Sequence, residues 1–336
     1  MIFKTLGSSG LKVSQICVGT MMFGGPTEDS DAKRIVDDAA ARGVNFIDTA
    51  NTYEKGRSEE TVGRLIGDNR AEWIIATKLA QPTGSGRNDR GLSRRNMIAA
   101  TEASLKRLRT DWIDIQYIHR VDPAVSWTEV ARTFGDLIRS GKIRYWGLSN
   151  VRAWHIPVIA QACREVGSPP PVVLQPYYNI MTRMPEVELL PAARAFSLGV
   201  AIYSPLARGI LSGKYQPGSN APADTRAGRN DRRMMETEWR TESLEIAQHL
   251  KVHAESTGHT LVDFAVAWAL NNAAVTPVIA GPRTYQQWRS YIDALKCPWT
   301  PDDEALVDSL VPPGHPSTPG YTDPGYPVEG RFPVVS

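Results

Sequence analysis

The chain has 336 residues, of which 42% are hydrophobic and 22% charged, and its formal net charge is +2. This composition is typical of a globular protein, and the balanced charge argues against a nucleic-acid or anionic-membrane partner. Three cysteines with no close pair predict neither a disulfide framework nor a cysteine-based zinc site. Because no apolar run is long enough for a signal peptide or a membrane span, and the cysteines fit a reducing cytosol, we expect a cytoplasmic protein.

A hairpin and eight repeated units follow one another along the chain. The segment Phe3–Val13 contains the turn residues GSSG and predicts a β-hairpin at the floor of the fold. Eight short apolar runs are separated by segments with helical periodicity. The first helical segment, 30–43, has a possible N-terminal cap at Ser30 or Asp31 and a stop at Gly43. Eight βα units predict parallel strands closed into a (β/α)8 TIM barrel spanning residues 1–310. The predicted strands are 15–19, 45–48, 73–78, 113–119, 143–149, 172–176, 199–204 and 275–281.

Two segments lie outside this repeat. Residues 204–237 are predicted to form a long polar loop after the seventh strand, and loops of that length are usually functional or disordered. Residues 311–336 form a tail too rich in proline and glycine to be a helix. Because Tyr321, Tyr326 and Phe332 are apolar anchors, we expect this tail to pack over the barrel mouth or against a neighbouring subunit.

Every predicted strand ends on a polar residue or a glycine, and in such barrels these ends face the active site. Taken singly, each has a structural explanation: Asp48 could cap a turn, Lys78 could reach solvent, and His119 could be a hydrogen-bonded core histidine. The barrel, however, brings these three side chains to one place. The eight ends are Gly19-Thr20, Asp48, Lys78, His119, Ser149-Asn150, Gln175, Tyr203-Ser204 and Gly281.

Tyr53 follows Asp48 by five residues, in the loop above this predicted site. A buried Lys78 and Asp48 should pair, because an unpaired buried charge is costly. The lysine ammonium should favour the phenolate, so we expect the Tyr53 pKa to fall from about 10 toward neutrality. Tyr53 could then protonate a developing alkoxide, with His119 donating a hydrogen bond to the same oxygen. The group lacks a nucleophile, which a hydride from a reduced nicotinamide would supply.

These residues lie in motifs that resemble those of the aldo-keto reductases. FIDTANTY at 46–53, TK at 77–78 and IHR at 118–120 are similar to the catalytic segments of that family. The cofactor segments also match in order, and the resemblance runs from about Phe3 to Leu295. They are GLSN at 147–150, LQPYYN at 174–179, YSPLARGILSGKY at 203–215 and GPRTYQQ at 281–287.

The resemblance implies a barrel that binds NADP(H) in extended form without a Rossmann domain, and no G-x-G-x-x-G motif opens a helix here. It implies that Tyr53 is the proton donor, that Lys78 and Asp48 tune it, and that His119 orients the carbonyl. Arg283 would contact the 2′-phosphate, so NADPH is expected over NADH. The other implied contacts are Ser149, Asn150 and Gln175 to the carboxamide, Tyr203 to the nicotinamide ring, Ser204, Leu206, Arg208, Gly209 and Lys214 to the pyrophosphate, Gln287 to the adenine, and Gly19, Thr20, Met21, Pro205 and Gly281 elsewhere along the cofactor.

The chain departs from the family pattern near the adenine site, where Pro282 follows Gly281 and Tyr291 replaces a common asparagine; Tyr291 could stack on the base instead.

Substrate choice in this family comes from loops over the barrel. These loops include Arg87 and Arg90, which we expect to lie in solvent and not to bind substrate. We therefore expect the substrate to be an apolar or aromatic aldehyde or ketone rather than a phosphosugar. The loops are Met22-Phe23, 80–92, 120–127 and the tail, with aromatic residues Phe23, Trp127 and Tyr321.

The expected function is NADPH-dependent reduction of a small carbonyl compound to the alcohol, in a possible homo-oligomer. One alternative is a cofactor-sensing subunit of a larger assembly with little turnover. A second is a Schiff-base aldolase with Lys78 as the nucleophile. A metal hydrolase is the least favoured, and no metal is expected, because no second histidine lies at a ligand-like spacing from His119.

Overall fold

The computed structural model describes residues 1–328 and 330. Eight parallel strands form one sheet in the order β10-β3-β4-β5-β6-β7-β8-β9. A bridge between Ile202 and Val278, with the amide of Ile279 donating to the carbonyl of Ile202 at 2.9 Å, joins the two outer strands and closes the barrel. The predicted (β/α)8 fold is therefore confirmed. The strands are β3 (Ile16–Gly19), β4 (Phe46–Asp48), β5 (Ile74–Leu79), β6 (Ile113–Ile118), β7 (Ile143–Ser149), β8 (Val173–Gln175), β9 (Gly199–Val200) and β10 (Val278–Ala280).

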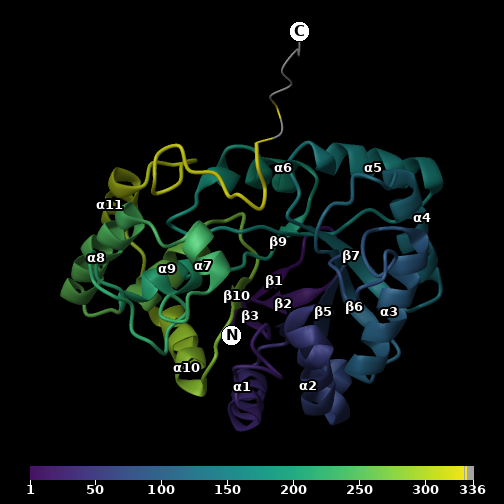
Figure 1. Cartoon of the computed structure of the whole chain (residues 1–336), viewed down its shortest axis with the longest axis horizontal. Helices are drawn as coiled ribbons and strands as arrows, with labels where there is room; N and C mark the ends of the chain where they lie inside the picture. The colour runs from purple at the N-terminus through teal and green to yellow at the C-terminus, as the bar shows by residue number, and fades with distance from the viewer. Residues whose placement is uncertain (329, 331–336) are drawn as a thin grey trace.

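The helices surround the strands, and Figure 1 shows α1 and α2 at the bottom, α3 and α4 at the right, α5 and α6 at the top and α8 to α11 at the left. The α-helices are α1 (Asp29–Ala41), α2 (Arg57–Ile66), α3 (Arg94–Leu108), α4 (Trp127–Arg139), α5 (His155–Val166), α6 (Leu189–Ala195), α7 (Arg232–Thr237), α8 (Thr241–Ser256), α9 (Leu261–Asn271), α10 (Tyr285–Asp293) and α11 (Pro301–Leu310). Short 3-10 turns are η1 (Tyr53–Gly56), η2 (Gly67–Glu72), η3 (Met184–Glu186), η4 (Ala207–Ser212) and η5 (Ala294–Lys296).

Capping residues explain several helix boundaries. Ser93 accepts a hydrogen bond from the amide of Asn96 at the start of α3, and Gly141, with φ +73°, follows the end of α4. The predicted cap of α1 is wrong, because the helix begins earlier, after Glu28, which makes no side-chain cap bond. Acidic side chains in its first turn instead complement the helix dipole.

The N-terminal hairpin lies at the floor of the barrel. Strands β1 (Phe3–Thr5) and β2 (Lys12–Ser14) pair antiparallel, as predicted. Leu6 and Val13 are fully buried and pack in a cluster with residues from inside the barrel, such as Phe46. A second and larger cluster fills the space between the strands and the helices. The hairpin thus covers one end of the barrel and leaves the other end for a site.

Two short helical elements lie within residues 204–237, so the prediction of a continuous loop there is only partly correct. They are η4 and α7, and Asp231 caps α7 by accepting from the amide of Met234. The tail has no helix up to residue 328, and Figure 1 shows it in yellow, crossing from α11 over the end of the barrel. Phe332 lies outside the described residues. Among residues 1–328 and 330, no helix is long and apolar enough to span a membrane.

Candidate active site

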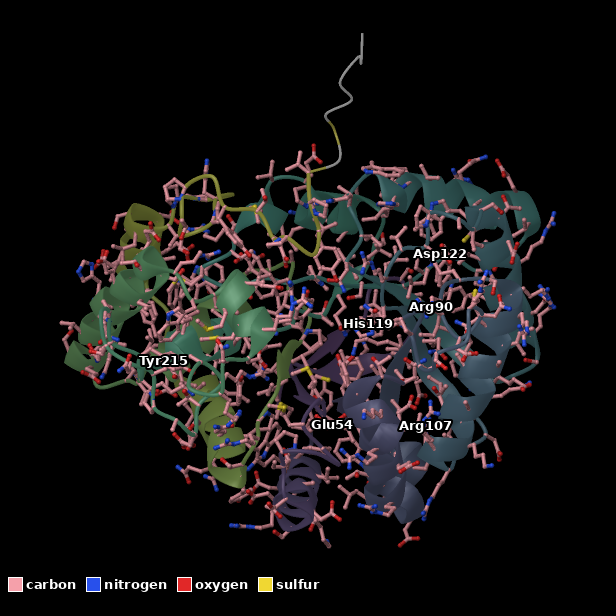
Figure 2. The ribbon with its side chains drawn as sticks, viewed as in Figure 1. Glu54, Arg90, Arg107, His119, Asp122 and Tyr215 are labelled. Carbon is pink, nitrogen blue, oxygen red and sulfur yellow. The ribbon has the colours of Figure 1, made fainter. Side chains whose placement is uncertain are left out.

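Four predicted catalytic residues meet at the C-terminal end of the barrel. The ammonium Nζ of Lys78 lies 2.6 Å from Oδ2 of Asp48 and 3.0 Å from the hydroxyl of Tyr53. The rings of Tyr53 and His119 meet edge to face, with centroids 5.9 Å apart. His119 lies close to the centre of the molecule in Figure 2. The structure therefore brings together the side chains that sequence reasoning placed at the ends of three strands and in one loop.

The ammonium of Lys78 has a partner for each of its three hydrogens. Besides Asp48 and Tyr53, it donates to the backbone carbonyl of Thr49 at 2.8 Å. Burial disfavours the ammonium, but the charge of Asp48 outweighs this and raises the pKa of Lys78. A lysine that is protonated at neutral pH and donates to three partners is a poor nucleophile, so the geometry disfavours the Schiff-base aldolase alternative.

The predicted fall of the Tyr53 pKa is wrong. Burial and the negative charge of Asp48 raise this pKa, and together they outweigh the opposing effect of the Lys78 ammonium. Sequence reasoning counted the lysine and left out the loss of water around the phenol. Tyr53 consequently keeps its proton at neutral pH. Since its oxygen accepts a hydrogen bond from Lys78, its own hydrogen is available to another acceptor.

His119 is a neutral imidazole in this environment. Burial, with a smaller effect from the charge of Lys78, lowers its pKa to about 3. Within the described part of the chain, its Nδ1 is buried and has no hydrogen-bond partner. A neutral ring can donate one hydrogen bond without placing a second positive charge beside Lys78.

A hydrogen-bonded group from three strands lies next to these four residues. Gln175 donates from Nε2 to Oδ1 of Asp48 at 2.8 Å, and Ser149 donates to the carbonyl of Gln175. The amide of Asn150 donates to the carbonyl of His119, and its oxygen accepts from the hydroxyl of Tyr203 at 2.8 Å. The residues predicted for the carboxamide and the ring are thus held in place by bonds to the catalytic group.

One cavity of about 660 Å³ connects this group to a cluster of cations. Asp48, Tyr53 and His119 line it, whereas Lys78 is buried beneath it. Gly19 lies in the wall of this cavity, and a larger residue would not fit at this position, because a Cβ there would lie 2.8 Å from the carbonyl oxygen of Ala280. All the residues predicted for cofactor binding line this cavity: Gly19, Thr20, Met21, Ser149, Asn150, Gln175, Tyr203, Ser204, Pro205, Leu206, Arg208, Gly209, Lys214, Gly281, Arg283 and Gln287.

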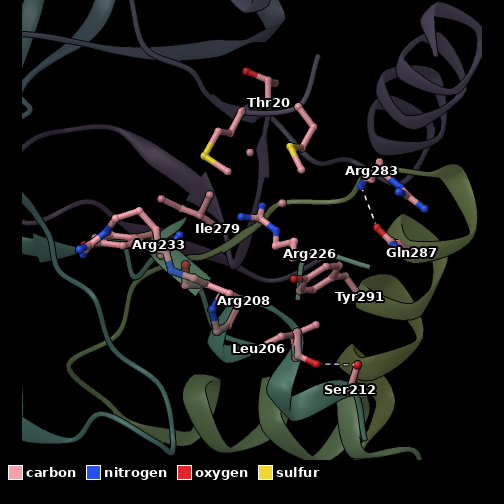
Figure 3. A pocket seen from close by; sticks show the side chains of 18 of the residues that line it. Thr20, Leu206, Arg208, Ser212, Arg226, Arg233, Ile279, Arg283, Gln287 and Tyr291 are labelled. Atoms are coloured by element: carbon pink, nitrogen blue, oxygen red, sulfur yellow. Dashed lines mark hydrogen bonds between the residues drawn. The ribbon is translucent and has the colours of Figure 1, made fainter. Parts of the chain in front are cut away.

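Sequence reasoning missed Arg226, Arg229 and Arg233, which also line the cavity; Tyr326, expected as an anchor of a tail over the barrel mouth, lines it too. The arginines come from the run TRAGRNDRR at 225–233, whose density of cations was an available signal. Figure 3 shows Arg226 between Ile279 and Tyr291, and both Arg226 and Arg208 line the cavity. Burial and the like charge of Arg208 lower the pKa of Arg226, whose Nη1 lies 3.9 Å from Oδ2 of Asp231. An anionic ligand would offset this crowding of positive charge.

The predicted adenine end lies beside α10. The amide of Arg283 donates to Oε1 of Gln287 at 2.8 Å, as Figure 3 shows, and Nη1 of Arg283 donates to the carbonyl of Asp224. Tyr291 is buried and lines the same cavity. An elongated cavity with a cationic end and a neutral proton-donating end fits the donor set that a nicotinamide dinucleotide requires.

Three aromatic residues predicted for the substrate loops lie elsewhere. Phe23 is fully buried in the core, Trp127 packs edge-on against His155, and Tyr321 lies under the guanidinium of Arg240. Apolar side chains on short loops can turn toward the protein interior, and the prediction that these aromatic residues face the substrate did not allow for this. Arg87 and Arg90 are exposed, as favoured for a solvated loop. In the described residues, no group of three or more His, Cys, Asp or Glu side chains is placed to hold a metal.

Comparison with known proteins agrees with this geometry. The family model "Aldo/keto reductase family" matches residues 15–312. The chain is 36% identical over 326 residues to "Uncharacterized oxidoreductase YrpG" of Bacillus subtilis, covering 93% of this chain and 96% of that protein. It is also 36% and 37% identical, over 301 residues each, to proteins of Arabidopsis thaliana and Oryza sativa named "Probable voltage-gated potassium channel subunit beta", covering 88% of this chain and 91% of each relative. The chain therefore belongs to the aldo/keto reductase family, whose members are oxidoreductases that generally use NAD(P)H.

Proposed function

We propose that the protein is an NADPH-dependent reductase that converts an aldehyde or ketone to the alcohol, with Tyr53 as the general acid. The observation that carries this proposal is the contact between Lys78 and the Tyr53 hydroxyl at 3.0 Å, at the neutral end of the cavity. A phenol that accepts from an ammonium and keeps its own hydrogen is suited to donate that hydrogen to a carbonyl oxygen.

Each residue of the group has a distinct part in this reaction. NADPH, when bound, would supply a hydride for the carbonyl carbon. The Tyr53 hydroxyl and the His119 imidazole donate hydrogen bonds to the carbonyl oxygen and polarise it. The proton of Tyr53 then moves to the developing alkoxide, and the Lys78 ammonium stabilises the phenolate that remains. Asp48 holds Lys78 in position through the 2.6 Å ion pair.

The cationic part of the cavity supports NADPH as the preferred cofactor. Ser149, Asn150 and Gln175 would hold the carboxamide, and Tyr203 would stack on the ring. The planar guanidinium of Arg283 suits a 2′-phosphate, which NADH lacks. The remaining predicted contacts are Ser204, Leu206, Arg208, Gly209 and Lys214 for the pyrophosphate and Gln287 for the adenine.

A panel of aldehydes and ketones, assayed by the absorbance decay of NADPH beside NADH, tests this function. We expect decay with at least one carbonyl compound and faster decay with NADPH. Tyr53→Phe should abolish it. If Tyr53→Phe reduced the carbonyl compound as fast as the wild-type protein, Tyr53 would not be the general acid.

The names of the plant relatives support a second candidate, a cofactor-sensing subunit of a larger assembly. The two candidates differ in turnover. Tight NADPH binding without decay in the presence of any carbonyl compound would favour the sensing subunit, whereas rapid turnover would favour the reductase.

A further inference from the structure

The tail residues 312–328, which we call the strap, contact three other segments across the barrel end, through one backbone carbonyl and two arginine side chains. The amide of Ser317 donates to the carbonyl of Met181 at 3.0 Å. The guanidinium of Arg240 lies 3.8 Å from the ring centroid of Tyr321 and donates to the hydroxyl of Ser317. Arg152 donates from Nη2 to the carbonyls of residues 326 and 327, at 2.7 and 2.8 Å. Figure 1 shows the strap in yellow, dipping toward the strands.

The strap reaches the catalytic end of the cavity. The half-buried Tyr326 lines the same cavity as Tyr53 and His119. Tyr203, the ring predicted to stack on the nicotinamide, lines this cavity together with Tyr326. Burial raises the pKa of Tyr203, and the charges of Tyr326 and Asp323 raise it further. The remaining wall at this end includes the apolar side chains of Met21 and Met22.

The strap also sets the charge of this end. Arg233 lines the cavity, and Figure 3 shows it at the side away from Arg283. Its Nη2 lies 2.6 Å from Oδ2 of Asp323, in the strap, and its Nη1 lies 3.0 Å from Glu236. Glu236 is shared with Arg232 at 2.7 Å, so Asp323 is the carboxylate that belongs to Arg233 alone. With Asp323 in place, the guanidinium offers little net charge to a substrate.

We propose that two strap residues determine which carbonyl compounds enter this end of the cavity: Asp323 is the counter-ion that cancels the Arg233 charge and so favours uncharged over anionic compounds, and the Tyr326 ring is a wall that limits their width. This inference rests on the proposed reductase function for its substrates. It assigns substrate choice to residues that lie outside the catalytic group.

Asp323→Asn tests the counter-ion. Asparagine keeps the side-chain oxygen that accepts from the amide of Gly325 at 2.7 Å, so the turn survives while the charge is lost. Benzaldehyde and 4-carboxybenzaldehyde are matched in shape and differ in charge. We expect the ratio of kcat/KM for the carboxylated aldehyde to that for benzaldehyde to rise about tenfold, mainly through KM.

Two further variants complete this test. Arg233→Gln combined with Asp323→Asn removes both charges and should return the ratio to its original value. Asp308→Asn removes a carboxylate from another arginine pair, with Arg183, away from the cavity, and should leave the ratio unchanged. An unchanged ratio in Asp323→Asn, or a raised ratio in the double variant, would overturn the assignment of Asp323.

Tyr326→Ala and Tyr326→Phe test the wall. The alanine variant should lose selectivity for benzaldehyde over the bulkier 1-naphthaldehyde by about fivefold or more, whereas the phenylalanine variant keeps the ring and should keep the selectivity. Equal selectivity in all three proteins would exclude Tyr326 from the wall.

Ligand binding separates this inference from the proposed function. Calorimetry with benzoate and benzamide, in the presence and absence of NADP⁺, needs no turnover. We expect Asp323→Asn to bind benzoate about tenfold more tightly and benzamide equally well. If the wild-type protein reduces neither aldehyde but shows this shift, the reductase proposal fails and the strap proposal holds. If aldehydes are reduced and benzoate affinity does not change, the strap proposal fails alone.

Discussion

The Nζ of Lys78 lies 3.0 Å from the hydroxyl of Tyr53, and both lie next to Asp48 at the neutral end of an otherwise cationic cavity. This relationship makes the phenol an acceptor from the ammonium and a donor toward the cavity. It also makes the ion pair beneath the phenol important for stability, because Lys78 and Asp48 are almost completely buried.

Lys78→Met should abolish turnover and lower the free energy of unfolding by about 3–5 kcal/mol, because it leaves the Asp48 carboxylate buried without its partner. The double variant with Asp48→Asn should recover much of that stability while remaining inactive. Urea denaturation and NADPH-dependent turnover measure the two effects. A double variant as unstable as Lys78→Met would show that the unpaired charge is not the cause.

Tyr53→Phe should lower kcat for reduction by about 10²–10⁴-fold, the range expected for loss of a positioned general acid. The affinity for NADPH should change little, since the aromatic ring remains and only the hydroxyl is lost. Stopped-flow turnover and cofactor binding are the measurements. Tyr145→Phe is the matched control, because Tyr145 packs against the core cluster inside the barrel and does not line the cavity.

His119 should make the protein less stable in acid. Its pKa is lowered to about 3 in the folded protein, so below the unfolded value of 6.5 only the unfolded chain takes up this proton. Stability therefore falls as pH falls from 6.5 toward 3, by about 2 kcal/mol between pH 7 and pH 5. His119→Gln should lose about that much less over the same interval in urea titrations. The same acid sensitivity in both proteins would assign it to other groups.

Arg283→Leu should raise the Kd for NADPH about tenfold or more and leave the Kd for NADH nearly unchanged, because only NADPH carries a 2′-phosphate for the guanidinium to contact. Fluorescence titration with both cofactors measures this. Arg289→Leu is the control, since Arg289 lies on α10, the helix that follows Arg283, does not line the cavity, and pairs with Asp293 at 3.9 Å. Equal losses for both cofactors in Arg283→Leu would place the phosphate elsewhere.

The barrel and the meeting of the candidate catalytic residues at its end could be predicted from the sequence. Short apolar runs alternating with helical segments specify parallel strands, and the C-terminal ends of such strands all open on the same face. A polar residue that ends a strand therefore has a known place, whatever the intervening loops do. That is why Asp48, Lys78 and His119 could be assigned to one site, and why the predicted cofactor residues line one cavity.

Only the tertiary structure decided the pKa of Tyr53 and the course of the strap. The pKa depends on how much water the fold removes around the phenol, and no local pattern records this. The strap and the loop before α7 have no hydrophobic period, so their positions depend on contacts far apart in sequence, such as the ion pair between Arg233 and Asp323, which are 90 residues apart. The sequence by itself determined the barrel and the residues at its mouth, whereas long-range packing and burial determined how that mouth is closed and charged.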